Sequence, residues 1–143
     1  MKALPRAIVV LCLVLSSLAY GADARVSAGD ARAIRAVIRA QLDAFAHEDG
    51  PKAFSYASAD IREEFGDADA FMEMVRSSYP VVYRPASVDF LPPTALAGEV
   101  LQRVRMTDGA GRLWLARYHM EKQKDGAWRI AGCDLGPIGG TAT

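Results

Sequence analysis

Side chains able to carry acid–base or metal chemistry are few in this 143-residue chain. His47 and His119 are its two histidines. His47 precedes Glu48 and Asp49 at the end of a predicted helix, where a protonated imidazole interacts favourably with the helix dipole. Neighbouring side chains on a helix diverge, and no second histidine or cysteine follows at ligand spacing, so we expect no metal and no cofactor. His119 falls on the polar face of a predicted strand, where we expect it to be exposed.

Several carboxylates of the chain are candidates for an enzyme site. An isomerase or lyase without a cofactor needs a carboxylate whose pKa is tuned by an apolar pocket, with donors for the developing oxyanion. Asp89 and Asp134 lie at predicted strand ends, where a loop or cap role is the simpler interpretation. Glu63 and Glu64 follow Arg62 in a short predicted helix and are interpreted as a solvated face. We therefore predict no catalytic residue and keep this enzyme class as an alternative.

Residues 1–24 have the pattern of a bacterial secretory signal peptide. Lys2 and Arg6 precede residues 7–18, which are uncharged and mostly apolar. That run is shorter than the roughly 20 residues of a membrane-spanning helix. Small residues follow it and permit cleavage after Ala19, Gly21 or Ala24. We expect a mature protein in the periplasm or the medium, with an uncleaved N-terminal anchor as the alternative.

Composition restricts the partners of the mature chain. Lys and Arg together number 17, as do Asp and Glu, so no global field attracts nucleic acid. No apolar run of membrane-spanning length follows the predicted signal. Cys12 would leave with the signal, and Cys133 would remain without an intramolecular partner. We interpret Cys133 as a small buried hydrophobic residue, with a reactive thiol or an intermolecular bridge as alternatives. Residues 25–135 suffice for one domain, and the Gly/Pro/Thr-rich residues 136–143 are predicted to be a flexible tail.

The first half of the mature chain has the period of helices. A helix of roughly 20 residues is predicted to begin at the cap Ser27 and to end at residues 49–51, Asp-Gly-Pro. Shorter helical segments are predicted at 51–56, at 58–65, and from Asp67 to just before Pro80. The apolar positions of the long helix recur at steps of three and four: Ile34, Val37, Ile38, Leu42 and Phe45.

The second half switches to the two-residue period of strands. Strands are predicted at 81–83, 88–91, 99–106, 113–122 and 127–135. A tight hairpin at residues 124–126 would pair Met120 with Ile130 and Lys122 with Trp128. A turn at residues 108–111 would pair Val104 with Trp114 and Val100 with Tyr118.

This pairing sorts the strands into an apolar and a charged face, which supports the register because a one-residue slip would mix the sets. The apolar face holds Val100, Val104, Met106, Trp114, Ala116, Tyr118, Met120, Trp128 and Ile130. The charged face holds Arg103, Arg105, Arg117, His119, Glu121 and Arg129, with Leu101, Leu113 and Leu115. The apolar face needs a cover. We therefore predict an α+β fold, with a long N-terminal helix and two or three short helices on one face of a curved, four- to five-stranded antiparallel sheet.

Four segments carry a family resemblance: residues 53–58, 71–75, 79–85, and 118–122 with the last hairpin. They resemble a bacterial family known as domain of unknown function 4864, over roughly residues 31–135. The element order and the ending Asp125 to Gly132 also resemble the nuclear transport factor 2-like (cystatin-like, SnoaL-like) superfold. That resemblance implies a cone in which helices close against a strongly bent sheet, and a sheet face through which members often dimerise. Neither resemblance brings a catalytic motif.

Two sets of residues are candidates for binding. The candidate pocket residues on the inner, apolar side are Tyr56, Tyr83, Gln102, Trp114 and Tyr118. The candidate interaction surface on the charged face is the row Arg103, Arg105, Arg117 and Arg129. The row is either ordinary solvent-facing charge or a contact for an anionic partner or a second copy. No aromatic residue is interleaved for base stacking, so nucleic acid is not expected.

An aromatic-rich inner face without an acid–base pair favours a binding module over an enzyme. We therefore expect an exported, non-catalytic domain that binds a small apolar ligand in the cone or a protein partner through the sheet. A cofactor-independent isomerase or lyase with its site in the cone is one alternative. An envelope accessory or structural protein is the other.

Overall fold

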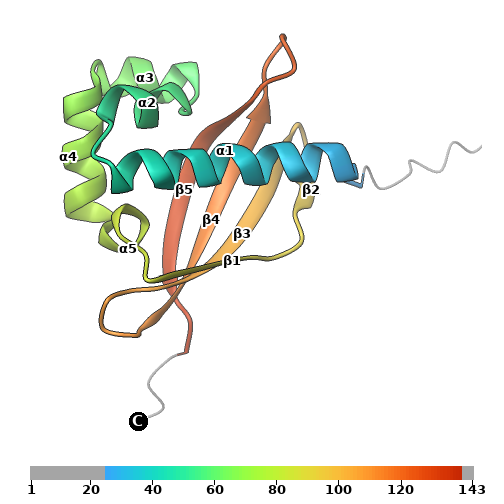
Figure 1. Cartoon of the computed structure of the whole chain (residues 1–143). Coiled ribbons are helices and arrows are strands. Elements are labelled where there is room, and N and C mark those ends of the chain that lie inside the picture. Colours follow the sequence, from blue (N-terminus) through green and yellow to red (C-terminus); the bar gives the residue numbers. More distant parts are fainter. Residues whose placement is uncertain (1–24, 140–143) are drawn as a thin grey trace, which may run out of the picture.

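A computed structural model describes residues 25–139, which form a layer of helices on one face of an antiparallel sheet (Figure 1). The predicted signal peptide and the last four residues of the predicted tail lie outside the described residues. The helices are α1 (Ala28–Ala46), α2 (Gly50–Ser55), α3 (Ala59–Phe65), α4 (Ala68–Ser78) and α5 (Pro80–Tyr83). The strands are β1 (Ser87–Phe90), β2 (Thr94–Leu96), β3 (Glu99–Thr107), β4 (Leu113–Lys122) and β5 (Trp128–Pro137).

Side-chain caps begin the first four helices. Ser27 accepts a hydrogen bond from the amide of Asp30, and Asp49, Ser58 and Asp67 cap α2, α3 and α4 in the same way. Such a cap satisfies a backbone N–H that has no partner inside the helix. The three predicted short segments are confirmed within a residue or two, and the long helix is confirmed from its predicted start. It ends at Ala46, three residues before Asp49, because Glu48 adopts a left-handed conformation with φ of 54° and Asp49 caps the next helix instead of ending this one.

The predicted strand at residues 81–83 is wrong, because these residues form the single helical turn α5. Pro80 occupies its first turn, and the amides of Tyr83 and Arg84 donate to the carbonyls of Tyr79 and Pro80. Val81 and Val82 are β-branched, yet both are buried here, so packing decides against their strand propensity. This turn raises the short helices to four, one more than predicted.

The sheet has the order β1-β3-β4-β5, with β2 also pairing with β3. All these pairings are antiparallel. The short strand β2 was not predicted. The prolines at 92 and 93 interrupt the edge between β1 and β2, and the buried side chain of Gln102 bridges the break. Its amide nitrogen donates to the carbonyl oxygens of Leu91 and Arg103, at 2.6 and 2.9 Å.

The β3–β4 register differs from the prediction by two residues. Val104 lies opposite Ala116, and Val100 opposite Met120. The turn is centred one residue later than predicted, because the Asp108 carboxylate accepts from the amides of Ala110 and Arg112 and the Asp108 amide donates to the carbonyl of Arg112. A slip of two residues keeps every side chain on its predicted face, so the two faces are confirmed.

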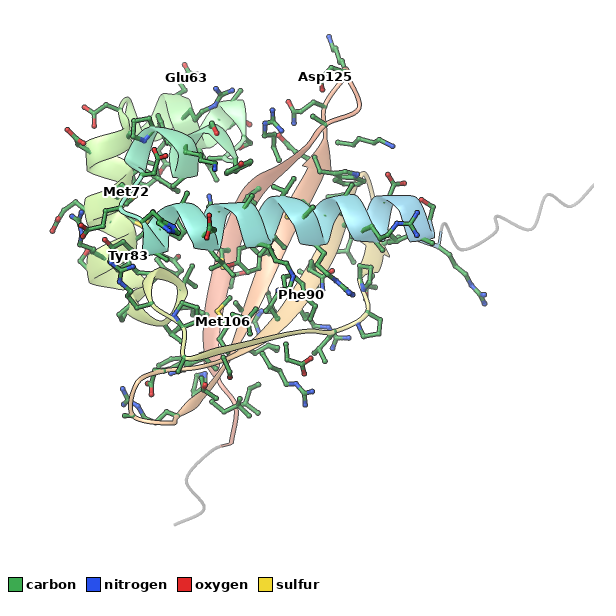
Figure 2. All side chains as sticks on the ribbon, in the orientation of Figure 1. Glu63, Met72, Tyr83, Phe90, Met106 and Asp125 are labelled. Atoms are coloured by element: carbon green, nitrogen blue, oxygen red, sulfur yellow. The ribbon has the colours of Figure 1, made fainter. Side chains whose placement is uncertain are left out.

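The β4–β5 pairing is confirmed near the hairpin, whose tip is marked by Asp125 in Figure 2. Met120 pairs with Ile130, and Lys122 with Trp128. An irregularity between His119 and Met120 then shifts the register, so that Tyr118 lies opposite Cys133. Strand β5 continues to Pro137, two residues beyond its predicted end.

Helix α1 covers the inner face of the sheet. Ile34, Ile38 and Phe45 are at most 1% exposed, as are Val104 and Met120 across from the helix. Met106 and Phe90 lie on the side of the sheet that α1 crosses (Figure 2). The guanidinium groups of two arginines of α1 lie over the ring of Phe90, Arg35 at 5.4 Å and Arg39 at 4.8 Å.

Truncation of Ile38 measures how much the fold depends on this cover. Ile38→Ala leaves a void between α1 and the sheet, and we expect a loss of about 2–5 kcal/mol in the free energy of unfolding. Arg32→Ala, an exposed position on the same helix, should change it by no more than about 0.5 kcal/mol. Urea denaturation followed by circular dichroism compares the two. Equal effects of the two substitutions would contradict the account of α1 as the main cover.

Candidate functional site

A pocket of about 580 Å³ lies between the C-terminal half of α1, helices α3 and α4, and strands β4 and β5. Its volume is in the range of small-molecule sites. The pocket lies where α3 and α4 face the part of β5 that follows Ile130. At Ile130 itself, the backbone of β5 is hydrogen-bonded to residues 56–58. The lining is mainly apolar, and its buried members include Phe45, Phe71, Val75, Val82, Tyr118 and Ile130.

Tyr118 supplies the most unusual polar group of the pocket. Its side chain is fully buried, and its hydroxyl has no hydrogen-bond partner among residues 25–139. Burial raises the pKa of Tyr118 well above its ordinary value of 10. The hydroxyl therefore stays protonated at neutral pH, where it can donate or accept a hydrogen bond but cannot act as a base.

Two further groups line the pocket beside Tyr118. The Tyr79 hydroxyl donates to the carbonyl of Cys133 at 3.1 Å, which joins α4 to β5. Burial also raises the pKa of the Cys133 thiol to about 12. At neutral pH this thiol stays protonated, so it lacks the thiolate that a nucleophilic cysteine requires.

His119 lies between two carboxylates from the neighbouring strands. Its Nδ1 is 3.0 Å from Oε1 of Glu99 on β3, and its Nε2 is 3.1 Å from Oδ2 of Asp134 on β5. All three residues line the pocket, and the side chain of His119 is 33% exposed. Hydrogen bonds to Glu99 and then to Asp134 raise the pKa of His119 above its ordinary value of 6.5. Because each imidazole nitrogen already faces a carboxylate, neither nitrogen is free to act as a general base.

The shift of register in β5 explains why sequence reasoning missed this group. Strict alternation after Ile130 would put Asp134 on the inner face and Cys133 on the outer face. The shift past His119 reverses them, so that Asp134 lies opposite Arg117 and Cys133 opposite Tyr118. Gly132 lies at this irregularity and is the signal that could have indicated it, because a glycine inside a strand often marks a bulge.

Of the five predicted pocket residues, Tyr118 lines this pocket. Trp114 lines a second pocket of about 610 Å³, with residues 108–110, Arg112 and Leu135. Tyr56, Tyr83 and Gln102 line neither of these two pockets. The Tyr83 hydroxyl instead donates to Glu48 and accepts from Arg76.

The second pocket has a weaker claim to be a binding site because its polar groups are already engaged. The indole of Trp114 donates to the Asp108 carboxylate at 3.1 Å, and the side chain of Arg112 does so at 2.9 Å. The hydrogen bond from Trp114, together with those from Arg112 and Ala110, lowers the pKa of Asp108 to about 2.

The four candidate arginines share the outer face but differ in their surroundings. Arg105 pairs with Asp89, and Arg129 donates to the carbonyl of Trp128. Arg103 lies directly opposite Arg117 across β3 and β4. Like charges in this position repel, so the row is not neutralised throughout.

No helix among the described residues is long and apolar enough to cross a membrane. Within residues 25–139, no three His, Cys, Asp or Glu side chains come together in a way that could hold a metal ion. What the fold and the pocket define is an α+β domain with helices on one face of an open antiparallel sheet and a partly apolar side pocket. This arrangement is compatible with the nuclear transport factor 2-like superfold.

Comparison with known families then identifies the chain. It belongs to the family described as Domain of unknown function (DUF4864), which it matches over residues 27–142. The resemblance to domain of unknown function 4864 is thereby confirmed. No curated protein and no solved structure matches the chain.

The paired carboxylates around His119 predict a pH dependence. The folded-state pKa of His119 is raised, so its ion pairs stabilise the fold fully below the unfolded-state value of about 6.5. This contribution is lost as the pH rises through the folded-state pKa. Glu99→Gln removes the carboxylate whose hydrogen bond raises the pKa of His119 most, and it should lower that pKa toward 6.5. An NMR titration of the imidazole, assigned with His119→Gln, measures both values. A wild-type value at or below 6.5 would contradict this geometry.

Proposed function

We propose that this protein is a non-catalytic binding module that takes a small, largely apolar molecule into the pocket between α3, α4 and β5. The observation that carries the proposal is the mainly apolar pocket, together with its lining residue Tyr118, whose buried hydroxyl lacks a partner in the described chain. A buried polar group left without a hydrogen bond destabilises a fold by about 1–3 kcal/mol. A ligand that carries a polar atom at the buried end of its apolar body would satisfy it.

The chemistry around the pocket supports binding over catalysis. Tyr118 and Cys133 keep their protons at neutral pH, because burial raises the pKa of both. The imidazole of His119 is held by Glu99 and Asp134. The alternative, a cofactor-independent isomerase or lyase, needs a base directed into the pocket, and these groups do not favour one.

Removing the Tyr118 hydroxyl should not destabilise the protein. We expect Tyr118→Phe to leave the free energy of unfolding unchanged or to raise it, because no protein hydrogen bond is lost. Tyr83→Phe removes the hydrogen bonds with Glu48 and Arg76 and should lower it by about 1 kcal/mol. Urea denaturation gives both values. A larger loss in Tyr118→Phe than in Tyr83→Phe would mean that the hydroxyl serves the fold.

Binding itself can be measured with a neutral reporter dye. N-phenyl-1-naphthylamine fluoresces strongly in apolar surroundings, and we expect saturable binding to the wild-type protein. Met74→Trp places a larger side chain in the pocket lining and should weaken binding at least about tenfold, since it fills the site. Leu113→Trp, at an exposed position on β4, is the matched control and should bind as the wild type does. Equal binding by all three proteins would place the dye elsewhere and refute the pocket.

The opposed pair Arg103 and Arg117 favours a second candidate, in which the outer face contacts a protein partner. Their repulsion would be relieved by carboxylates of the partner, or by those of a second copy in a homodimer. Light scattering of the protein tests the homodimer. A dimer that Arg103→Ala weakens supports this candidate, whereas a monomer at high concentration removes its homodimer form.

We also propose that the protein acts outside the bacterial cytoplasm, in the periplasm or the medium. The support is the pattern of residues 1–24, a short basic segment, an apolar run and small residues at the cleavage positions. A mature protein lacking these residues in the exported fraction would support export, and an uncleaved chain in the cytoplasm would refute it.

A further inference from the structure

The side chains that line the pocket carry a net negative charge. Glu64, Glu99 and Asp134 all belong to the lining, and among residues 25–139 no lysine or arginine does. The one basic group is His119, which lies between two of these carboxylates. With His119 protonated, three carboxylates and one imidazolium give −3 + 1 = −2, so the lining is negative at neutral pH.

The carboxylates and the apolar groups occupy different depths. The side chains of Glu99 and Asp134 are 35% and 61% exposed, which places them toward the mouth. Phe45 and Phe71 are 1% and 6% exposed and form the floor. The pocket is therefore amphipathic, with an acidic rim above an aromatic interior.

An independent observation shows that the interior is equipped for a ligand. Tyr118 is a lining residue whose side chain is 1% exposed, and its buried hydroxyl has no partner in the described chain. A group of this kind is rare in folded proteins unless something binds it. The pocket thus combines one unpaired polar group, an apolar and partly aromatic lining, and a negatively charged entrance.

We propose that the pocket selects a hydrophobic cation, an amine whose ammonium group binds at the rim of Glu64, Glu99 and Asp134 while its apolar body packs against the aromatic floor. This inference rests on the proposed binding function and adds the charge of the ligand to it. A free carboxylic acid of the same shape would meet three like charges at the mouth. A cation is attracted both by the carboxylates and by the aromatic faces.

A matched series of octyl compounds tests the charge separately from the apolar body. Octylamine, 1-octanol and octanoic acid share one chain and differ in the head group. Each displaces N-phenyl-1-naphthylamine from the protein at neutral pH and low salt. We expect octylamine to displace the dye at a concentration at least about fivefold lower than octanol, with octanoic acid the weakest of the three. In 0.5 M salt the advantage of the amine should shrink, because exposed charges are screened.

Two variants locate the charge effect at the rim. Glu64→Gln and Asp134→Asn should each weaken octylamine about twofold to fivefold and leave octanol unchanged, as expected for partly exposed ion pairs. Glu63→Gln is the control, because Glu63 also lies on α3 but is absent from the pocket lining and points away from the sheet in Figure 2. It should bind all three compounds as the wild type does.

The outcomes separate this inference from the function on which it rests. If octanol binds as tightly as octylamine and Met74→Trp blocks its binding, the proposed selectivity for a cation is overturned. The proposed apolar pocket would then stand. Loss of amine binding in Glu63→Gln as well would also overturn it, because the charge would then act from the whole surface. Failure of the dye and of every octyl compound to bind would overturn both proposals.

Discussion

The inner face of the sheet and the apolar side of α1 bury each other, and the remaining elements are arranged around that contact. Neither surface is stable in water alone, since Ile38, Val104 and Met120 would be exposed. Helix α1 spans the sheet obliquely, so its C-terminal end reaches Phe71 of α4 and Tyr83 of α5. The short helices must therefore complete the cover beside β5, and the pocket lies in the space that they leave there.

The irregular pairing of β5 determines the chemistry of that space. It brings Cys133 beside Tyr118 on the inner side and Asp134 beside His119 on the outer side. A regular strand would have separated these pairs. Tyr118 and Cys133 therefore form an interior whose hydroxyl and thiol keep their protons, while Asp134 adds a carboxylate at the entrance. This combination suits binding better than proton transfer.

The sequence was a good guide wherever a local signal decided the structure. Caps such as Ser27 and Asp67 and the three- and four-residue apolar steps predicted α1 and α4, and the alternation of strands predicted both faces of the sheet. The turn at Val81–Tyr83 was mispredicted, because burial against the core overrides the preference of valine for strands. The β3–β4 register was two residues off, because the carboxylate of Asp108 closes the turn through contacts that composition does not reveal.

The pocket was harder to predict than the fold. Tyr118 was expected there because its face could be read from alternation, whereas Glu64, Met74 and Tyr79 depend on how α3 and α4 lie against β5. That placement arises from contacts between segments far apart in the chain, such as the hydrogen bond from Tyr79 to Cys133. Periodicity within a single segment carries no information about it.

The central claim is that the space beside β5 is the binding site for a small molecule. Backbone amide NMR of the isotope-labelled protein during titration with octylamine tests this most directly. The account predicts saturable shifts that cluster at pocket-lining residues such as Phe65, Gly132 and Cys133, with the amides of Arg103 and Arg105 unmoved. Shifts centred on the outer arginines or around Trp114, or no saturable shift, would contradict it.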